Sequence, residues 1–457
     1  MGENLRPFTG IGVRRTHNCR MKRLSIHLGV LLLACAGCSA GDSAGLPPQP
    51  GSAACTLDAQ KQYVLDKMRD VYLWNDVLPA SVDLAAYPTP EALLDYLKTF
   101  QPLDNFSYID LAAADARFFA AGQYEGFGFS TRFETADELR FIRVFASSPA
   151  SSAGFARGQQ ILALNGRSIA EIESNEGIDA LFSLPTLEFT VRRQDGSEIT
   201  TSVTQGVVTI DPLPQFRIID RSDGTAVGYF ELVTFVSTAD DALRDVFDVF
   251  RQAGVTDVVM DLRYNGGGLV STTELLGDYL GGGVPDNTIF SKTVFNANHA
   301  ASNRIAYFQR LVESVNLSRL VVITTDRTAS ASELITNSMA PHADVSIVGS
   351  TTLGKPVGQL GIEFCDKVLR PTAFETLNAN DEGGYFDGLP ADCNSADDLS
   401  IAIGDDADPN LQAALTLLDT GACPLQASAV QAMRKPGPQR REPARRASPW
   451  REFAGAW

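Results

Sequence analysis

The stretch 320–359 (LVVITTDRTASASELITNSMAPHADVSIVGSTTLGKPVGQ) constrains the fold more than any other part of the chain. It begins with an apolar, β-branched run at 320–324, which is typical of a buried strand. After a short turn, Ser330 begins a helix that runs to about Met339, because hydroxyl residues cap helix starts. A second strand at 345–348 completes a strand–helix–strand unit, so we expect this part of the chain to be α/β.

A serine at such a strand-to-helix turn is well placed for nucleophilic catalysis. The helix N-terminus offers backbone N–H groups and a positive dipole end, which stabilise the oxyanion formed when Ser330 attacks a carbonyl. The hydroxyl needs a base, and the chain has only 4 histidines, of which His17 and His27 lie in or before a targeting segment. Lys355 is the better candidate, because it lies among Gly, Thr, Leu and Pro, and burial lowers the pKa of a lysine. A Ser-Lys pair is a known variant of the catalytic triad.

The motif TASASE, followed by the lysine of TTLGKPVGQ, resembles the carboxyl-terminal processing (tail-specific) proteases, which are serine–lysine peptidases. The resemblance implies that Ser330 is the nucleophile and that Lys355 is the general base. In many members of the family a glutamine soon after the lysine orients it, and here Gln359 has that position. The alternative is that Ser330 is only a helix cap and Lys355 only a turn residue, but the combined spacing favours catalysis.

A Gly-rich segment lies upstream, where a predicted strand at 257–262 leads into RYNGGG at 263–268. No Walker lysine follows and the spacing is not GxGxxG, so we do not interpret it as a phosphate site. In the resembling family the motif DLRxNGGG supplies one backbone N–H of the oxyanion hole, here close to Gly266 or Gly267. The other comes from Ala331, directly after the nucleophile. Glycine suits this place because only a bare backbone approaches the reacting carbonyl so closely.

The chain divides into several predicted units. Strands and helices alternate through much of 207–424, which predicts an α/β catalytic domain, although 362–424 reads as an acidic, Asn- and Gly-rich insertion with a final helix at 410–420. A helical segment at 55–121 precedes the β-rich part. Its stretches MRDVYLW and DNFSY also resemble the N-terminal part of the protease family, and we assign them to packing rather than to chemistry. The fold class is therefore mixed α/β.

A β-rich unit over 122–206 resembles a PDZ domain of the bacterial, circularly permuted kind. Its predicted strands cover 139–145, 160–164, 187–193 and 199–204. Gly126-Phe127-Gly128-Phe129 matches the carboxylate-binding loop, which binds a peptide's terminal carboxylate while the peptide adds to a sheet edge. The usual Asp after Arg-Gly is replaced by Gln159, which departs from the family at that turn. The alternative is a small β-domain without peptide binding.

The N-terminal region, 1–38, predicts export. We interpret Met21 as the true start, followed by two basic residues and an apolar core at 24–34 that is typical of a signal peptide and too short to span a membrane. The end of this core, LLACAGC, resembles a bacterial lipobox, so Cys35 or Cys38 would carry a lipid and tether the protein to a membrane on the periplasmic side. The alternative is a cleaved secretory peptide.

The other flanking segments and the remaining cysteines agree with export. Residues 39–54 are Gly-, Ser- and Pro-rich and predict a flexible linker, whereas 425–457 predict a disordered basic tail. Outside the signal, cysteines that fit an oxidising compartment are Cys55, Cys365, Cys393 and Cys423. We expect Cys365 to pair with Cys393 and Cys55 with Cys423, although other connectivities are open.

The composition narrows the function further. The formal net charge of −17 argues against nucleic acid as a partner. We expect no metal and no cofactor, since HExxH is absent and the only CxxC lies in the signal. The resemblance implies a serine endopeptidase that acts on unfolded or C-terminally exposed polypeptides. The alternatives are a PDZ-bearing lipoprotein that binds peptides without cleaving them, and a small-molecule acyl hydrolase on the same core.

Overall fold

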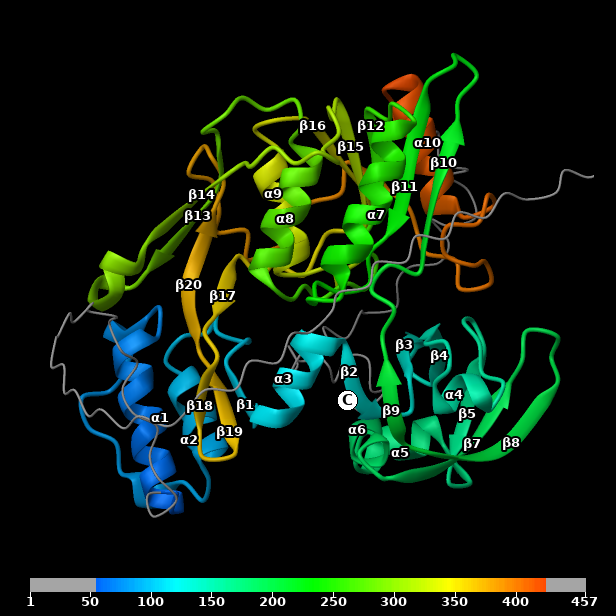
Figure 1. Ribbon diagram of the computed structural model, residues 1–457. Helices are drawn as coiled ribbons and strands as arrows, with labels where there is room; N and C mark the ends of the chain where they lie inside the picture. The colour runs from blue at the N-terminus through cyan, green and yellow to red at the C-terminus, as the bar shows by residue number, and fades with distance from the viewer. Residues whose placement is uncertain (1–54, 425–457) are drawn as a thin grey trace, which may run out of the picture. The chain divides into compact units, whose positions relative to one another are not determined.

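The computed structural model describes residues 55–424 (Figure 1). The predicted signal peptide with Cys35 and Cys38, the linker at 39–54 and the tail at 425–457 lie outside the described residues. Within 55–424, none of the helices has both the length and the apolar character needed to cross a membrane.

A six-stranded sheet carries the predicted nucleophile. All neighbouring strands in it run parallel except β10 and β11, which form an antiparallel pair. The strand order is β10 (Gln215–Asp220), β11 (Ala226–Glu231), β12 (Asp257–Asp261), β15 (Arg319–Thr324), β16 (Asp344–Gly349) and β21 (Cys393–Asn394). The strands predicted from the sequence at the centre of this sheet are confirmed within one or two residues.

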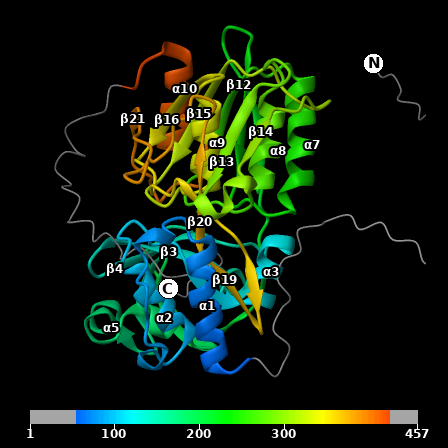
Figure 2. The same ribbon diagram turned by 90° about the vertical axis from the view of Figure 1, so that its left-hand side faces the viewer.

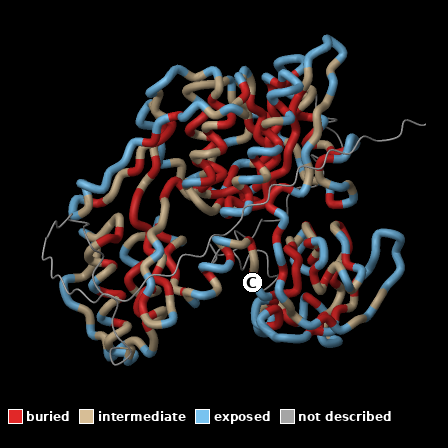
Figure 3. Tube along the Cα trace, viewed as in Figure 1, coloured by how far each residue is buried: buried red, intermediate tan, exposed pale blue. Residues whose placement is uncertain are grey.

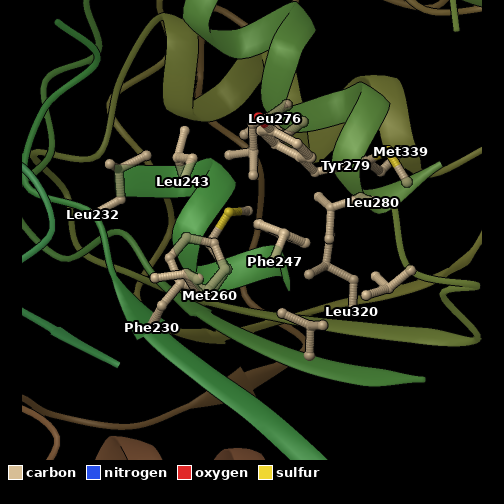
Figure 4. Packing of buried hydrophobic residues seen from close by; sticks show 14 of the residues in the cluster. Phe230, Leu232, Leu243, Phe247, Met260, Leu276, Tyr279, Leu280, Leu320 and Met339 are labelled. Atoms are coloured by element: carbon tan, nitrogen blue, oxygen red, sulfur yellow. The ribbon is translucent and has the colours of Figure 1, made fainter. Parts of the chain in front are cut away.

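Helices cover both faces of this sheet, as Figures 1 and 2 show. Those on one face are α7 (Ala239–Gln252), α8 (Val270–Leu280) and α9 (Ala331–Met339), and α10 (Pro409–Thr420) lies on the other. Side chains alternate along each strand, so Met260 packs with Phe247 of α7 (Figure 4), whereas Val259 lies in the cluster on the other face with Leu411 of α10. Because both faces are buried, these strands read as continuous apolar runs (Figure 3).

A second group of strands is antiparallel and carries the predicted base. One sheet has the order β14 (Arg304–Tyr307), β13 (Ile289–Phe295), β20 (Thr372–Leu377) and β17 (Val357–Gln359). Another has the order β1 (Tyr108–Leu111), β19 (Lys367–Arg370) and β18 (Ile362–Phe364). The expectation that 362–377 belongs to a loop-rich insertion is therefore wrong. Its strands are short and are followed in the sequence by many polar residues. For this reason the sequence pattern does not reveal that Val368 and Leu369 are buried.

The N-terminal segment packs against this second group. Its helices are α1 (Leu57–Val71), α2 (Pro90–Lys98) and α3 (Ala112–Ala121), with single 3-10 turns at Asn75–Val77 and Leu84–Ala86. Leu65 and Leu94 of the first two helices share one apolar cluster with Phe364 and Leu369. Since β1 also pairs with β19, the N-terminal segment and the β18–β19 hairpin pack together although they are more than 250 positions apart.

The PDZ-like unit is a sheet with its own aromatic core. The strand order is β3 (Phe129–Thr135), β4 (Glu138–Val144), β5 (Gln160–Leu164), β7 (Thr186–Arg192) and β8 (Glu198–Thr204), and β6 (Arg167–Ser168) pairs with β5. Short helices α4 (Pro149–Ser152), α5 (Ile169–Asn175) and α6 (Ile178–Phe182) complete it. The ribbon of β2 (Gln123–Gly126) and β9 (Gly206–Thr209) leads into and out of the unit. The four strands predicted here are confirmed.

Within residues 55–424 there are two disulfides, and the predicted pairing is wrong. Cys55 pairs with Cys365, and Cys393 pairs with Cys423. Cys55 precedes α1, which packs against the β18–β19 hairpin that bears Cys365, whereas Cys423 follows α10, which packs on the sheet that contains Cys393. Disulfides are typical of proteins outside the reducing cytoplasm.

Candidate active site

Ser330 lies at the turn between β15 and α9, where it is half-buried. Its backbone has φ 55° and ψ −113°, a conformation that residues with a side chain rarely adopt. Such strain persists only where the surroundings hold it in place, and it is found preferentially at functional sites. The predicted helix start and the predicted turn are therefore both present, and the turn is more constrained than a simple cap requires.

Glu333 connects the serine turn to the lysine turn. Its Oε2 accepts hydrogen bonds from the backbone N–H groups of Ser330 and Lys355, each at 2.8 Å. Its Oε1 accepts from Thr352 Oγ1 at 2.5 Å and from Gly354 N at 2.7 Å. Burial raises the pKa of this carboxyl, and the hydrogen bonds oppose that rise. Because one oxygen binds both N–H groups, the two turns are held within two hydrogen-bond lengths of each other.

Lys355 and Gln359 also meet, as the resemblance implied. Lys355 Nζ donates to Gln359 Oε1 at 2.7 Å. The Gln359 amide in turn donates to the carbonyl oxygens of Phe106 at 2.7 Å and Arg370 at 3.0 Å. Two accepting carbonyls fix the orientation of this amide, so that its oxygen faces the lysine. The side-chain oxygen of Gln359 therefore faces Lys355 Nζ.

The predicted oxyanion loop lies against the serine turn. A Cβ on Gly267 would lie 2.8 Å from both Ala331 N and Ser330 Cβ, so only glycine fits at this contact. Asn265 locks the loop in place, since its Oδ1 accepts from Gly267 N at 2.9 Å and its backbone oxygen accepts from Ala329 N at 3.0 Å. The N–H of Gly267 is therefore already engaged in a hydrogen bond within the loop.

A buried cluster of charged side chains centred on Arg263 holds the first residue of the loop at 263–268 in place. Arg263 is 2% exposed, and its guanidinium binds Asp261 and Asp408 at 2.5 Å and Asp397 at 2.8 Å. Asp397 also binds Arg157 of the PDZ-like unit at 2.7 Å. Burial alone would raise the pKa of Asp397, but the two guanidinium groups lower it to about 2. No local signal in the sequence points to this cluster, because Asp397 and Asp408 lie more than 130 positions from Arg263.

The predicted carboxylate-binding loop begins an edge strand of the PDZ-like sheet. The side chains of Phe127 and Phe129 are buried in the core of this unit. Gly128 has φ 89°, and a Cβ there would lie 2.1 Å from Ser148 Cβ. β3 follows this loop and pairs on one side with β4, which makes it the end of the strand order. Peptide addition needs an exposed edge strand next to such a loop, whereas Ser130 and Thr131 at the start of β3 are buried and Arg327 Nη1 donates to the carbonyl oxygen of Thr131 at 2.8 Å.

The two described histidines have other contacts. His299 Nε2 lies 2.7 Å from Asp70 Oδ1, and the ring of His342 binds the carbonyl oxygen of Ile289 at 3.0 Å. Burial lowers the pKa of His342. These contacts agree with the choice of a lysine rather than a histidine as the candidate base.

Comparisons with known proteins agree with this architecture. Residues 226–394 match the model for peptidase family S41, and residues 59–108 match the peptidase S41 N-terminal domain. The chain is 24% identical over 280 residues to carboxy-terminal processing protease CtpA of Bacillus subtilis, a match that covers 59% of this chain and 55% of that protein. It is 26% identical over 307 residues to a carboxyl-terminal-processing protease of Picosynechococcus, a match that covers 65% of this chain and 71% of that protein.

Solved structures share the fold. A putative S41 protease from Bacteroides fragilis superimposes with a TM-score of 0.62 at 23% identity, covering 79% of this chain and 97% of that one. A photosystem II D1 C-terminal processing protease gives a TM-score of 0.51 at 18% identity, and the match covers 75% of this chain and 93% of that one. Taken together, the comparisons define a serine-type peptidase. The chain belongs to peptidase family S41 and is a distant homologue of the carboxyl-terminal processing proteases.

Proposed function

We propose that this protein is an endopeptidase that cleaves unfolded or C-terminally exposed polypeptides with Ser330 as nucleophile and Lys355 as base. The observation that carries the proposal is the shared oxygen of Glu333, which binds the backbone N–H groups of both residues. It supports a serine and a lysine brought together in one site. The strained backbone of Ser330 supports the same assignment.

The proposed reaction begins with Lys355 in its neutral form. Its amine takes the proton of Ser330 Oγ while that oxygen forms a bond to the peptide carbonyl carbon. The N–H groups of Ala331 and of Gly266 or Gly267 stabilise the resulting oxyanion. The ammonium, oriented by Gln359, then gives its proton to the leaving amine as the peptide bond breaks.

The second half of the reaction repeats these steps with water. Water attacks the acyl-enzyme and gives a proton to Lys355, and the tetrahedral species collapses as Ser330 Oγ leaves and regains that proton. The products are a peptide with a new carboxylate and a free enzyme. Protein groups alone supply the acid, the base and the oxyanion donors in this scheme.

The same proposal covers how the substrate is bound and in which compartment the protein acts. The PDZ-like unit holds a substrate's terminal carboxylate at Gly126–Phe129 while the peptide adds to the edge of β3. The disulfides support a site of action outside the cytoplasm. There, a lipid on Cys35 or Cys38 tethers the protein to the periplasmic side of a bacterial membrane.

Casein hydrolysis by the full chain tests the proposal. We expect Ser330→Ala and Lys355→Ala each to lose about four orders of magnitude or more in rate, because each removes a reacting group. Ser302→Ala, at an exposed serine, is the matched control and should keep wild-type activity. If wild type were no faster than the two site variants, the protein would instead be a peptide-binding lipoprotein without cleavage.

A further inference from the structure

Phe106, from the segment DNFSY that leads into β1, contacts both the predicted general base, Lys355, and the glutamine that orients it, Gln359. The centre of its ring lies 5.3 Å from Lys355 Nζ. Its carbonyl oxygen accepts a hydrogen bond from Gln359 Nε2 at 2.7 Å. From the sequence alone, this segment is expected only to pack against the core. One residue that touches the lysine with its ring and the glutamine with its backbone has a more specific position than packing requires.

The turn that carries Phe106 is itself held firmly. Asp104 is 3% exposed, and its Oδ1 accepts from the backbone N–H groups of Phe106 at 3.1 Å and Ser107 at 2.9 Å. The same oxygen accepts from Thr372 Oγ1 at 3.0 Å, and Ser107 Oγ accepts from Thr372 N at 2.8 Å. Thr372 begins β20, which pairs with the strand of Gln359. The turn therefore holds Phe106 in a fixed position beside the base.

We propose that Phe106 is a positioning residue for the base, and this inference rests on the proposed function. The face of an aromatic ring attracts a cation but has no such attraction for a neutral amine. Lys355 becomes an ammonium when it takes the proton of Ser330, so the ring stabilises the protonated base relative to the resting one. Interactions that strengthen on the way to the transition state accelerate the step.

The backbone of Phe106 adds a second contribution. Its carbonyl and that of Arg370 occupy the Gln359 amide nitrogen, which leaves the amide oxygen to accept from Lys355. A reversed amide would place a donor against the ammonium. The N-terminal segment thereby becomes a part of the catalytic machinery, because it determines which end of Gln359 the lysine meets.

Other charged groups lie near this base and must stay constant in any test. The buried carboxylate of Glu333 on α9 binds the backbone N–H of Lys355. Arg370 on β19 is paired with Asp115 of α3 at 2.5 Å, and Asp104 lies under the turn of Phe106. Variants at Phe106 alone leave all of these groups in place, so a change in the pH profile reports on the ring.

The test compares Phe106→Leu with Phe106→Trp, using the pH dependence of kcat/KM for a peptide substrate. Without the ring the ammonium is less stable, so the pKa of the base falls. We expect Phe106→Leu to move the acid limb of the profile to lower pH by about 0.5 pH units. We also expect kcat to fall roughly 3- to 10-fold, since a weaker base removes the serine proton less readily. Phe106→Trp keeps a ring and should restore the wild-type limb.

Two outcomes would overturn the inference: an acid limb that does not move in Phe106→Leu, or ring-retaining variants, Phe106→Trp and Phe106→Tyr, that both behave as Phe106→Leu does. Phe100→Leu, at a partly exposed phenylalanine of the same segment, is the matched control for general loosening. Thermal unfolding of each variant checks the fold, and Phe106→Tyr supplies a second ring-retaining variant if the tryptophan does not fit.

Labelling by a fluorophosphonate probe separates this inference from the proposed function. If wild type neither hydrolyses casein nor takes up the probe at Ser330, the proposed function fails and the role of Phe106 fails with it. If wild type is active and labelled while Phe106→Leu keeps the wild-type pH profile, only the inference about Phe106 fails.

Discussion

The two halves of the proposed site are held in different ways. Ser330 and the loop at 263–268 form the nucleophile side, which is built at the ends of neighbouring parallel strands, β12 and β15. Lys355 and Gln359 form the base side, which is built on an antiparallel strand and on the N-terminal segment. Gln359 binds Phe106 across 253 positions of the sequence. The strand, turn and helix that present Ser330 are thus contiguous in sequence, although Arg263 in the loop also binds the distant Asp397 and Asp408, whereas the base is oriented by the distant Phe106.

Glu333 belongs to both sides, so among the residues that hold the reacting groups in place its substitution has the largest expected effect on activity. Glu333→Gln replaces one carboxylate oxygen by an amide nitrogen, which would face two hydrogen-bond donors. Each buried donor left without an acceptor costs about 1–3 kcal/mol. We therefore expect a fall of about 3 kcal/mol in the free energy of unfolding and a loss of roughly 100-fold or more in kcat/KM. Urea unfolding and casein hydrolysis measure the two quantities.

The matched control for this substitution is Glu188→Gln, at an exposed glutamate of the PDZ-like unit, which should change neither quantity. If Glu333→Gln kept wild-type activity, the two turns would not need the shared carboxylate. The base side would then be positioned by Gln359 and Phe106 alone, independently of the serine turn.

The same difference explains what could be predicted from the sequence. The strand, turn and helix around Ser330 were predictable because hydrophobic periodicity and capping are local signals. The pairing of Lys355 with Gln359 came from a motif of neighbouring residues. Phe106 could not be assigned to the site, because its contact with Gln359 is distant in sequence. The predicted disulfide partners were wrong for the same reason, because no local signal in the sequence indicates which segment lies beside Cys55 in the fold.

The two disulfides test the dependence of the base side on the N-terminal segment. Cys55–Cys365 closes 310 positions and ties α1 to the hairpin after Gln359, whereas Cys393–Cys423 closes only 30 on the far side of the sheet. In the chain-entropy view these loops stabilise by at most about 6 and about 4 kcal/mol. We expect Cys55→Ser with Cys365→Ser to lower kcat several-fold.

Cys393→Ser with Cys423→Ser is the matched control and should leave kcat near the wild-type value. Both double variants should unfold at lower temperature, so kcat is measured well below the midpoint of either. Equal losses of kcat in the two double variants would contradict a special link between the N-terminal segment and the base.

Asp397 gives the smallest expected effect on activity and a pH-dependent effect on stability. Its pKa is lowered to about 2 in the folded protein, against an ordinary value of 3.8, because Arg157 and Arg263 outweigh the cost of burial. A lowered pKa means that the stabilisation is complete above about pH 4 and is lost as the pH falls through about 2. At about 1.4 kcal/mol per pH unit, the ionised carboxylate contributes about 2 kcal/mol. We expect Asp397→Asn to lower the free energy of unfolding by this amount at pH 7.

The difference in the free energy of unfolding between wild type and Asp397→Asn should become smaller as the pH falls from 4 towards 2. Urea unfolding at a series of pH values measures this difference. Asp387→Asn, at an exposed aspartate, should show no gap at any pH. A gap that stays constant down to the lowest pH would mean that Asp397 acts through hydrogen-bond geometry rather than through its charge. Because the cluster supports the oxyanion loop and not the lysine, kcat should fall less than in the disulfide variant on the base side.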